Sequence, residues 1–174
     1  MIATLITLLA VLFTPSTDAD ALRRTAPSYL TPSSASDNLD AARIAGALVN
    51  VDPDLLLSIA WHESRYEPQA VGREPGGRVS CGPMTPEPVA RCTAKPMLAG
   101  YVAGARHLRD WIGATPDIHT ALLGYAGGFS MIRACARGPV LRPRGAHDDL
   151  CMTPEVFLWR RDWIRRERTR PPAV

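Results

Sequence analysis

Residues 58–68, SIAWHESRYEP, place one glutamate, Glu63, in a segment that otherwise has the pattern of a buried helix. The segment is preceded by Asp52 and Pro53, which are typical of a helix N-terminus: aspartate accepts from free backbone amides, and proline has no amide to leave unpaired. Ile59 lies four residues before Glu63 and therefore on the same helical face. A carboxylate on an apolar face must be paired, hydrogen-bonded or protonated. Glu63 is therefore either a satisfied structural acid or a group with a chemical role.

The chain has 174 residues, which is enough for one domain of ordinary size. Its hydrophobic fraction of 46% allows a globular core, and its net charge of +3 is only mildly basic. No nucleic-acid-reading motif accompanies that charge, so we expect no nucleic-acid partner. The lone imidazoles His62 and His107 lack the paired spacing of metal ligands, and we expect no metal.

Apolar residues recur at helical spacing through most of the chain, and no stretch alternates as a strand does. We therefore expect an all-α, predominantly helical fold. The expected helices cover residues 37–49, 52–68, 97–112, 117–128, 129–135 and 153–167. The apolar residues of the first are Leu39, Ile44, Ala47 and Leu48, and those of the last are Val156, Trp159, Trp163 and Ile164.

The N-terminus resembles an export signal. Residues 1–13, MIATLITLLAVLF, form an apolar run that is short for a membrane span, and Ala19 and Ala21 are small residues suited to a cleavage site. We expect a secreted or periplasmic protein with no stable membrane span after signal cleavage. The predicted organisation is a signal peptide (1–21), a flexible linker (22–36), a folded domain (37–167) and a disordered tail (168–174).

The four cysteines agree with an oxidising compartment. They are Cys81, Cys92, Cys135 and Cys151, and they allow three disulfide connectivities. Proximity along the chain favours Cys81–Cys92 and Cys135–Cys151, each of which closes a loop that contains Gly or Pro. A zinc site is the competing interpretation, but the cysteines lack the paired CxxC spacing typical of zinc ligands.

Four segments in order resemble the successive motifs of the lytic transglycosylases, the goose-type lysozyme-like enzymes that cut peptidoglycan. They are LLLSIAWHESRYEPQAV, SCGPMT, YVAGARHLRDWI and ALLGYAGG, and the resemblance covers residues 39–137. It implies a lysozyme-like single domain with a long, disulfide-stapled Gly/Pro-rich loop beside the cleft. It also implies a monomer that acts on peptidoglycan glycan strands without a cofactor.

The resemblance assigns roles to particular residues. Glu63 matches the family's catalytic glutamate, a general acid and then base, and Ser64 matches the serine that supports it. Met84 and Thr85 fall on the Gly-Leu-Met-Gln motif, and Tyr125 falls on the Tyr-Asn motif, where it points into the cleft. The implied substrate-binding residues are therefore Ser64, Met84, Thr85 and Tyr125. Three positions depart from the family pattern: Pro83 replaces Leu, Thr85 replaces Gln and Ala126 replaces Asn.

A glutamate on an apolar face should hold its proton near neutral pH, as a departing glycosidic oxygen requires. In the family, the muramyl 6-hydroxyl then attacks and forms a 1,6-anhydro sugar without water. Two alternatives stay open: a hydrolytic lysozyme and a non-catalytic peptidoglycan-binding protein. The first would need a second acid or a fixed water, and Glu67, Glu74, Glu87 and Asp110 more simply read as surface charge. Local wall opening for an envelope-spanning apparatus is one expected setting.

Overall fold

The computed structural model describes residues 17–73, 79–84, 97–141 and 149–171, and within these ranges the chain is mostly helical. The predicted all-α class is therefore confirmed. No helix among the described residues is long and apolar enough to cross a membrane. In chain order, the elements are α2 (Thr17–Thr25), α3 (Pro32–Val49), α4 (Pro53–Ser64), β1 (Val71–Arg73), β2 (Val79–Cys81), α5 (Met97–Ala114), α6 (Ile118–Cys135), the 3-10 turn η2 (Leu150–Met152) and α7 (Thr153–Thr169).

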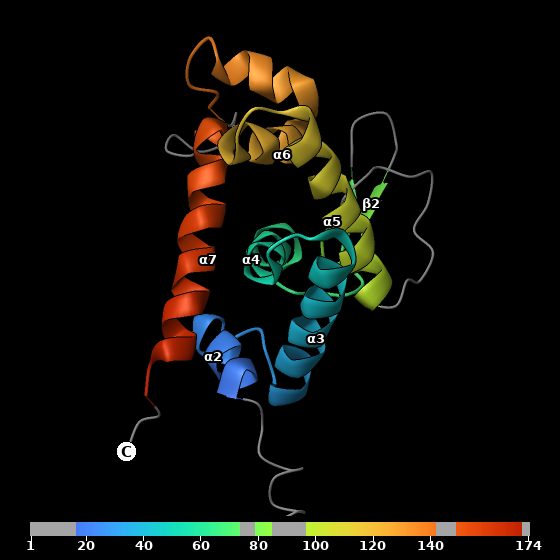
Figure 1. The fold of residues 1–174 in the computed structure, drawn as a ribbon, viewed down its shortest axis with the longest axis vertical. Helices are drawn as coiled ribbons and strands as arrows, with labels where there is room; N and C mark the ends of the chain where they lie inside the picture. Colours follow the sequence, from blue (N-terminus) through green and yellow to red (C-terminus); the bar gives the residue numbers. More distant parts are fainter. Residues whose placement is uncertain (1–16, 74–78, 85–96, 142–148, 172–174) are drawn as a thin grey trace, which may run out of the picture.

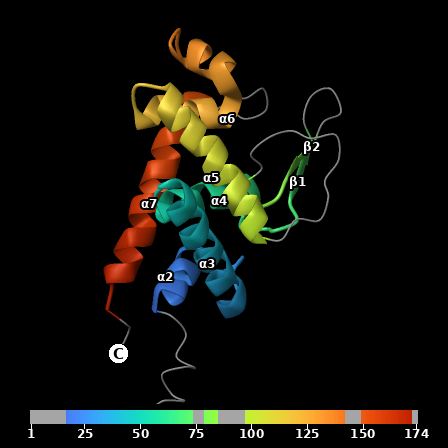
Figure 2. The same ribbon diagram turned by 45° about the vertical axis from the view of Figure 1, so that its right-hand side comes forward.

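Helix α4 lies in the middle of the molecule, with the other helices arranged around it (Figure 1). Asp52 caps its N-terminus by accepting from the backbone N–H of Asp54 at 3.0 Å, and Pro53 occupies the first turn. Every residue from Leu55 to Ala60 is buried. The strands β1 and β2 form an antiparallel pair with Val71 opposite Cys81, and this hairpin stands away from the helices (Figure 2).

Two arginines of α7 hold the N-terminal end of α4. Arg165 pairs with the capping Asp52 at 2.6 Å, and Arg168 pairs with the buried Asp54 at 2.6 Å. Burial raises the pKa of Asp54, and the positive charge of Arg168 opposes that effect. Helix α7 thus fixes the position of the helix that carries Glu63.

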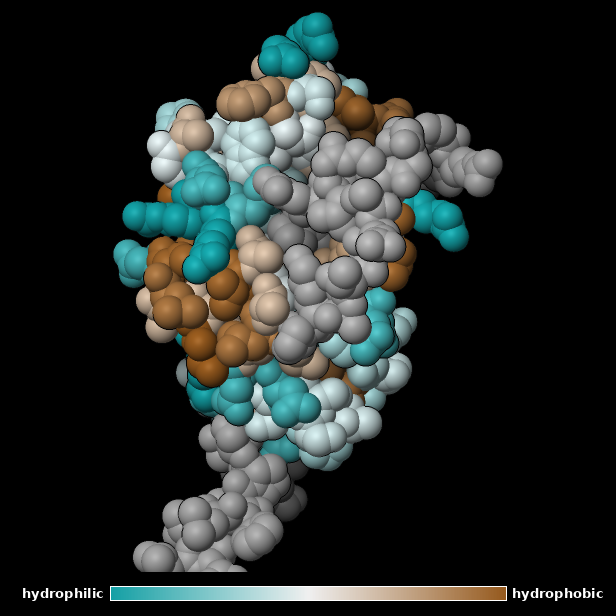
Figure 3. Space-filling model, turned by 90° about the vertical axis from the view of Figure 1, so that its right-hand side faces the viewer, coloured by the Kyte–Doolittle hydropathy of each residue, from teal (hydrophilic) through white to brown (hydrophobic). Residues whose placement is uncertain are grey.

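Helix α3 buries its small residues rather than the large ones that sequence periodicity favoured. Leu39 is buried as expected, but Ile44 is 48% exposed and Leu48 is 65% exposed. The buried face consists mainly of alanines and Gly46, which let α4 and α5 approach closely. A side-chain carbon at Gly46 would lie 2.5 Å from the backbone oxygen of Val51. On the side of α3 and α5, apolar residues gather in a surface patch (Figure 3).

The prediction of a flexible linker over residues 22–36 is wrong. Helix α2 ends at Thr25, and Leu22, Ala26 and Leu30 are all buried. Thr31 then starts α3 with a capping box: its hydroxyl accepts from the N–H of Ser34, whose hydroxyl accepts from the N–H of Thr31. A nine-residue helix is marginal alone, so α2 depends on its packing against α3 and α7. The predicted signal peptide, residues 1–21, stays a prediction: residues 1–16 lie outside the described part, and residues 17–21 form the start of α2.

The C-terminal helix differs from its prediction in two ways. Ile164 is fully buried, but Val156 and Trp159 are 45% and 57% exposed, because the buried face runs through Phe157, Arg160 and Ile164. The helix also continues to Thr169, so a disordered tail from residue 168 is wrong for its first two residues.

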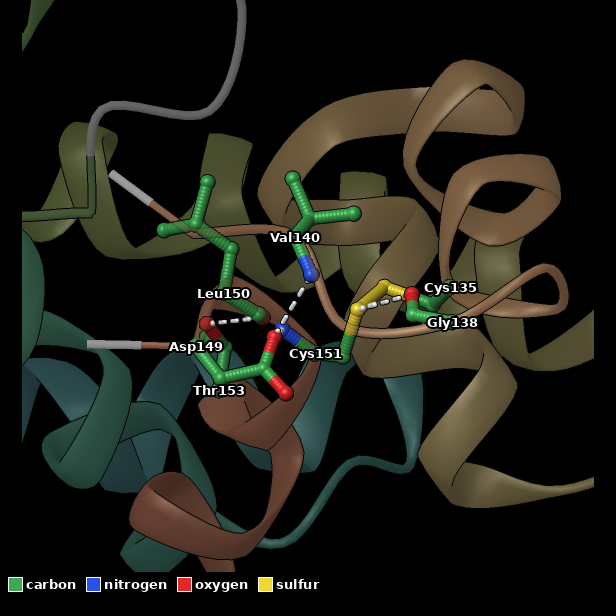
Figure 4. Close-up of a disulfide and its surroundings, with 7 residues drawn as sticks. All are labelled: Cys135, Gly138, Val140, Asp149, Leu150, Cys151 and Thr153. Carbon is green, nitrogen blue, oxygen red and sulfur yellow. Dashed lines mark hydrogen bonds between the residues drawn. A yellow bond between two sulfur atoms is a disulfide. The ribbon is translucent and has the colours of Figure 1, made fainter. Parts of the chain in front are cut away.

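The disulfide between Cys135 and Cys151 confirms one predicted pair (Figure 4). It joins the end of α6 to η2, and Asp149 organises the turn beside it by accepting from the backbone N–H groups of Val140 at 2.9 Å and Cys151 at 3.0 Å. Cys81 is also disulfide-bonded. Its predicted partner, Cys92, lies outside the described residues.

Candidate functional site

Glu63 lies in the last turn of α4 and is half-buried rather than fully enclosed. The helix ends because Arg65 and then Tyr66 adopt left-handed backbone conformations, with φ of 57° and 67°. The N–H of Arg65 still donates to the carbonyl of Trp61 at 3.0 Å, which closes the final turn. The carboxylate is thus attached to a rigid, buried helix at the point where that helix reaches the surface.

Ser64, the next residue, connects α4 to the short segment that follows β2. Its hydroxyl lies 2.8 Å from the carbonyl oxygen of Pro83 and 2.9 Å from that of Ala60. A serine hydroxyl has one proton and donates to one of these carbonyls at a time. Ser64 therefore serves in this structure as a brace between α4 and the residues that matched the second motif.

The segment Gly82–Met84 is seated against α5 through glycines. A side-chain carbon at Gly100 would lie 2.5 Å from the Pro83 ring, and one at Gly104 would lie 2.6 Å from Met84. Gly82 itself has a φ of 88°, a conformation that favours glycine, and its N–H donates to the carbonyl of Ala70 at 2.9 Å. These close approaches fix the backbone carbonyls of the segment in place.

Tyr125 of α6 reaches the same segment from the other side. Its hydroxyl donates to the backbone oxygen of Met84 at 2.6 Å, and only 8% of the residue is exposed. Burial raises the pKa of Tyr125 well above its usual 10.0, and the negative charge of Glu63 raises it further. The hydroxyl therefore stays protonated near Glu63 and acts as a donor.

The chain changes direction just after Tyr125. Gly127 and Gly128 have non-helical backbone angles, and Gly128 has a φ of 66° that suits glycine. The prediction that one helix ends in this Gly-Gly pair and another starts near Phe129 is thus confirmed, since α6 consists of two helical parts across a kink.

The structure brings four of the five predicted site residues together: Glu63, Ser64, Met84 and Tyr125. The fifth, Thr85, lies outside the described residues. Met84 is fully buried, so its side chain does not face a ligand, and its contribution is the backbone carbonyl that Tyr125 binds. Ser64 and Tyr125 likewise use their hydroxyls on backbone carbonyls. Of these residues, Glu63 is the one that carries a chemically reactive group.

Two residues that are not among the predicted site residues form a chain of contacts that starts at Tyr125. The ring of His107 lies 5.2 Å from the Tyr125 ring, centroid to centroid, and the indole N–H of Trp111 points at the Nε2 of His107 at 3.3 Å. Both residues are on α5, four positions apart, so their shared helical face was the available signal. Trp61 of α4 does not belong to this chain of contacts. Its ring packs under Arg160, whose guanidinium lies 3.9 Å from the ring centroid.

The other acidic residues considered as a second catalytic group are exposed where the structure describes them. Glu67 is exposed and accepts from the N–H of Gln69 at 3.1 Å, and Asp110 is exposed on α5. Glu74 and Glu87 lie outside the described residues. Within the described ranges, no group of three or more His, Cys, Asp or Glu side chains is placed to hold a metal ion.

Comparisons with models of known families, with curated proteins and with solved structures found no match to this chain. The assignment of a function therefore rests on the four sequence motifs and on the geometry around Glu63.

Proposed function

We propose that this protein is a peptidoglycan lytic transglycosylase that uses Glu63 as its single catalytic acid and base. The bond cleaved is the β-1,4 bond between N-acetylmuramic acid and N-acetylglucosamine. One observation carries the proposal: a half-buried glutamate ends α4 beside Ser64 and Tyr125, which brace the Gly82–Met84 segment next to it. These are the positions that the resemblance to the family assigns.

The reaction needs one proton donor that later becomes an acceptor. Protonated Glu63 gives its proton to the glycosidic oxygen, and the bond from that oxygen to C1 of the muramyl sugar breaks. The carboxylate then takes the proton of the muramyl 6-hydroxyl while that oxygen bonds to C1. The products are a 1,6-anhydro end and a free 4-hydroxyl, Glu63 is again protonated, and no water is consumed.

The neighbours of Glu63 suit a positioning role in this scheme. Tyr125 is neutral over the physiological range, so it places no negative charge beside the carboxylate. Ser64 and Tyr125 tie α4 and α6 to one segment, which limits movement of Glu63 relative to the sugar. A second carboxylate is not required, in agreement with the exposed positions of Glu67 and Asp110.

The proposed location is secreted or periplasmic, where peptidoglycan is accessible. The Cys135–Cys151 disulfide supports an oxidising compartment. Local opening of the wall for an envelope-spanning apparatus is the proposed setting.

The test is digestion of purified sacculi by the wild type, by Glu63→Gln and by Glu67→Gln, with products identified by mass spectrometry. Glu67→Gln is the matched control, because it removes an exposed carboxylate four residues away. Anhydromuropeptides should form with the wild type and the control and be absent with Glu63→Gln. Products with free reducing muramic acid would instead indicate a hydrolytic lysozyme. Sacculus binding without products from any form would indicate a glycan-binding protein.

A further inference from the structure

A row of aromatic rings extends from Tyr125 to the surface, and the site described above accounts only for its inner end. The ring of His107 lies 5.2 Å from Tyr125, Trp111 lies 6.4 Å from His107, and Phe129 lies 4.8 Å from Trp111, all between ring centroids. Exposure increases along the row: Tyr125 is buried, His107 and Trp111 are half-buried, and Phe129 is 59% exposed. The row therefore connects the surroundings of Glu63 with solvent.

Specific features of the fold hold the outer rings in place. Trp111 lies directly over Gly124, where a side-chain carbon would be 2.3 Å from the indole ring, so only glycine allows this packing. The indole N–H is oriented by His107. Phe129 follows Gly128, whose backbone conformation favours glycine and marks the kink in α6. Two glycines thus permit an arrangement in which Phe129 meets Trp111 edge to face.

Core packing accounts for Trp111, which packs against the hydrophobic core, but not for Phe129. A phenyl ring that is 59% exposed gains little from burial, and its apolar surface stays in contact with water. Rings of this kind, held rigidly and partly open, present a flat apolar face to a ligand at low entropic cost. Sugar rings offer a matching surface, because the C–H groups of a β-linked pyranose point to its two faces.

We propose that Trp111 and Phe129 form an outer sugar-binding subsite for the glycan strand whose linkage is cut at Glu63. Phe129 supplies the exposed stacking face, and Trp111 supports it from below. This inference rests on the proposed function for the identity of the strand. The contacts themselves require only a β-1,4-linked amino-sugar chain with apolar ring faces.

The experiment measures binding to full-length protein carrying Glu63→Gln, so that any bound strand stays intact. The probes are N-acetylglucosamine hexamer and purified peptidoglycan glycan strands, titrated by calorimetry. In this background, Phe129→Ala should weaken binding by several-fold up to about tenfold, the scale of one lost aromatic contact. Trp159→Ala is the matched control, because Trp159 on α7 is 57% exposed, and its loss should leave the affinity unchanged.

Two further variants separate stacking from general hydrophobicity. Phe129→Tyr keeps an aromatic face and should bind as the parent does, whereas Phe129→Leu keeps an apolar side chain and should bind as Phe129→Ala does. The NMR signal of the Trp111 indole N–H should move on titration of the parent. Unchanged affinity in Phe129→Ala, or no binding of either probe by the parent, would overturn the subsite.

Failure of the subsite and failure of the proposed function give different results. If wild-type protein releases anhydromuropeptides and Phe129→Ala does so with the same kcat/KM, the subsite is wrong and the enzyme assignment stands. If wild-type protein cuts nothing but Phe129→Ala loses glycan binding, the subsite stands and the transglycosylase assignment is wrong.

Discussion

Tyr125 joins the two sides of the candidate site through one hydroxyl. We expect Tyr125→Phe to lower the free energy of unfolding by about 1–3 kcal/mol, because the buried carbonyl of Met84 would lose its donor. Urea unfolding measures this change. Tyr29→Phe is the control, since Tyr29 is 57% exposed and its variant should unfold as the wild type does. Equal stability of Tyr125→Phe and wild type would show that the hydroxyl is not the brace described above.

Asp117 gives a prediction about pH. It caps α6 by accepting from the N–H of Thr120 at 2.9 Å and from its hydroxyl at 2.8 Å. The backbone hydrogen bond, followed by the side-chain one, lowers the pKa of Asp117 below its usual 3.8. The folded state thus favours the carboxylate, and this stabilisation is complete above the unfolded pKa and lost as the pH falls through the folded pKa.

We therefore expect Asp117→Ala to lower the urea midpoint at pH 7 and to differ little from the wild type once the pH falls below the folded pKa of Asp117, which lies below its usual 3.8. Asp117→Ser separates the cap from the charge, because serine also caps helices but does not titrate in this range. Its midpoint should stay near that of the wild type at pH 7. A constant difference between Asp117→Ala and wild type over the whole acid range would contradict this explanation.

One disulfide joins two elements of the fold, the C-terminal end of α6 and the turn η2. Cys135 and Cys151 are 16 residues apart in sequence, and a cross-link over a loop of that size stabilises a fold by about 3 kcal/mol. We expect the double variant Cys135→Ser/Cys151→Ser to lose about that much, measured by thermal unfolding without reductant. The wild type under reducing conditions should lose at least as much, because Cys81 is also disulfide-bonded. A double variant as stable as the wild type would show that η2 and the turn at Asp149 hold α6 without the cross-link.

Sequence patterns predicted elements better than they predicted which face of an element is buried. The start of α4 was predictable because Asp52 and Pro53 act locally, and the break at Gly127 and Gly128 because glycine favours it. The buried face of α3 was not predictable in this way. Its alanines and glycine are buried because they allow close helix packing, and that depends on α4 and α5 rather than on α3 itself.

The candidate site was predictable as a set of residues but not as a set of contacts. Helical spacing and the motif order singled out Glu63 and Tyr125. The acceptor of Tyr125 is a backbone carbonyl in a segment 41 residues away, and no side-chain pattern identifies such a partner. A single histidine or tryptophan in a helix gives no sign of a site on its own, and the contacts of His107 and Trp111 with α6 depend on how α6 packs against α5.

At the scale of the whole molecule, the two ends of the described chain hold each other. Helix α2 lies beside the C-terminal part of α7 (Figure 1). Arg24 pairs with Glu167 at 2.9 Å, and the buried Arg160 donates to the carbonyl of Thr25 at 3.1 Å. Since α7 also holds Asp52 and Asp54 of α4, the N-terminal helix supports the position of Glu63 through α7.

Two truncations test this arrangement. A protein that begins at residue 17 keeps α2 and serves as the reference for stability in urea. A protein that begins at residue 26 loses the fully buried Leu22 and should be less stable by about 2–5 kcal/mol or more. Equal stability of the two truncations would show that α2 only rests on the surface of α7.

The same packing bears on how an export signal would be processed. Cleavage after Ala21 would remove the first part of α2. The residues lost would include Ala19, which is buried, and Asp18, whose carboxylate pairs with Arg43. We therefore expect the exported protein to begin before Asp18, which keeps the helix whole. Intact-mass measurement of protein from the periplasm or medium, compared with the cytosolic precursor, gives the cleavage position. A mature chain that begins at Leu22 would contradict this expectation, because it keeps only the last residues of α2. Its stability should then be closer to that of the protein that begins at residue 26 than to that of the protein that begins at residue 17.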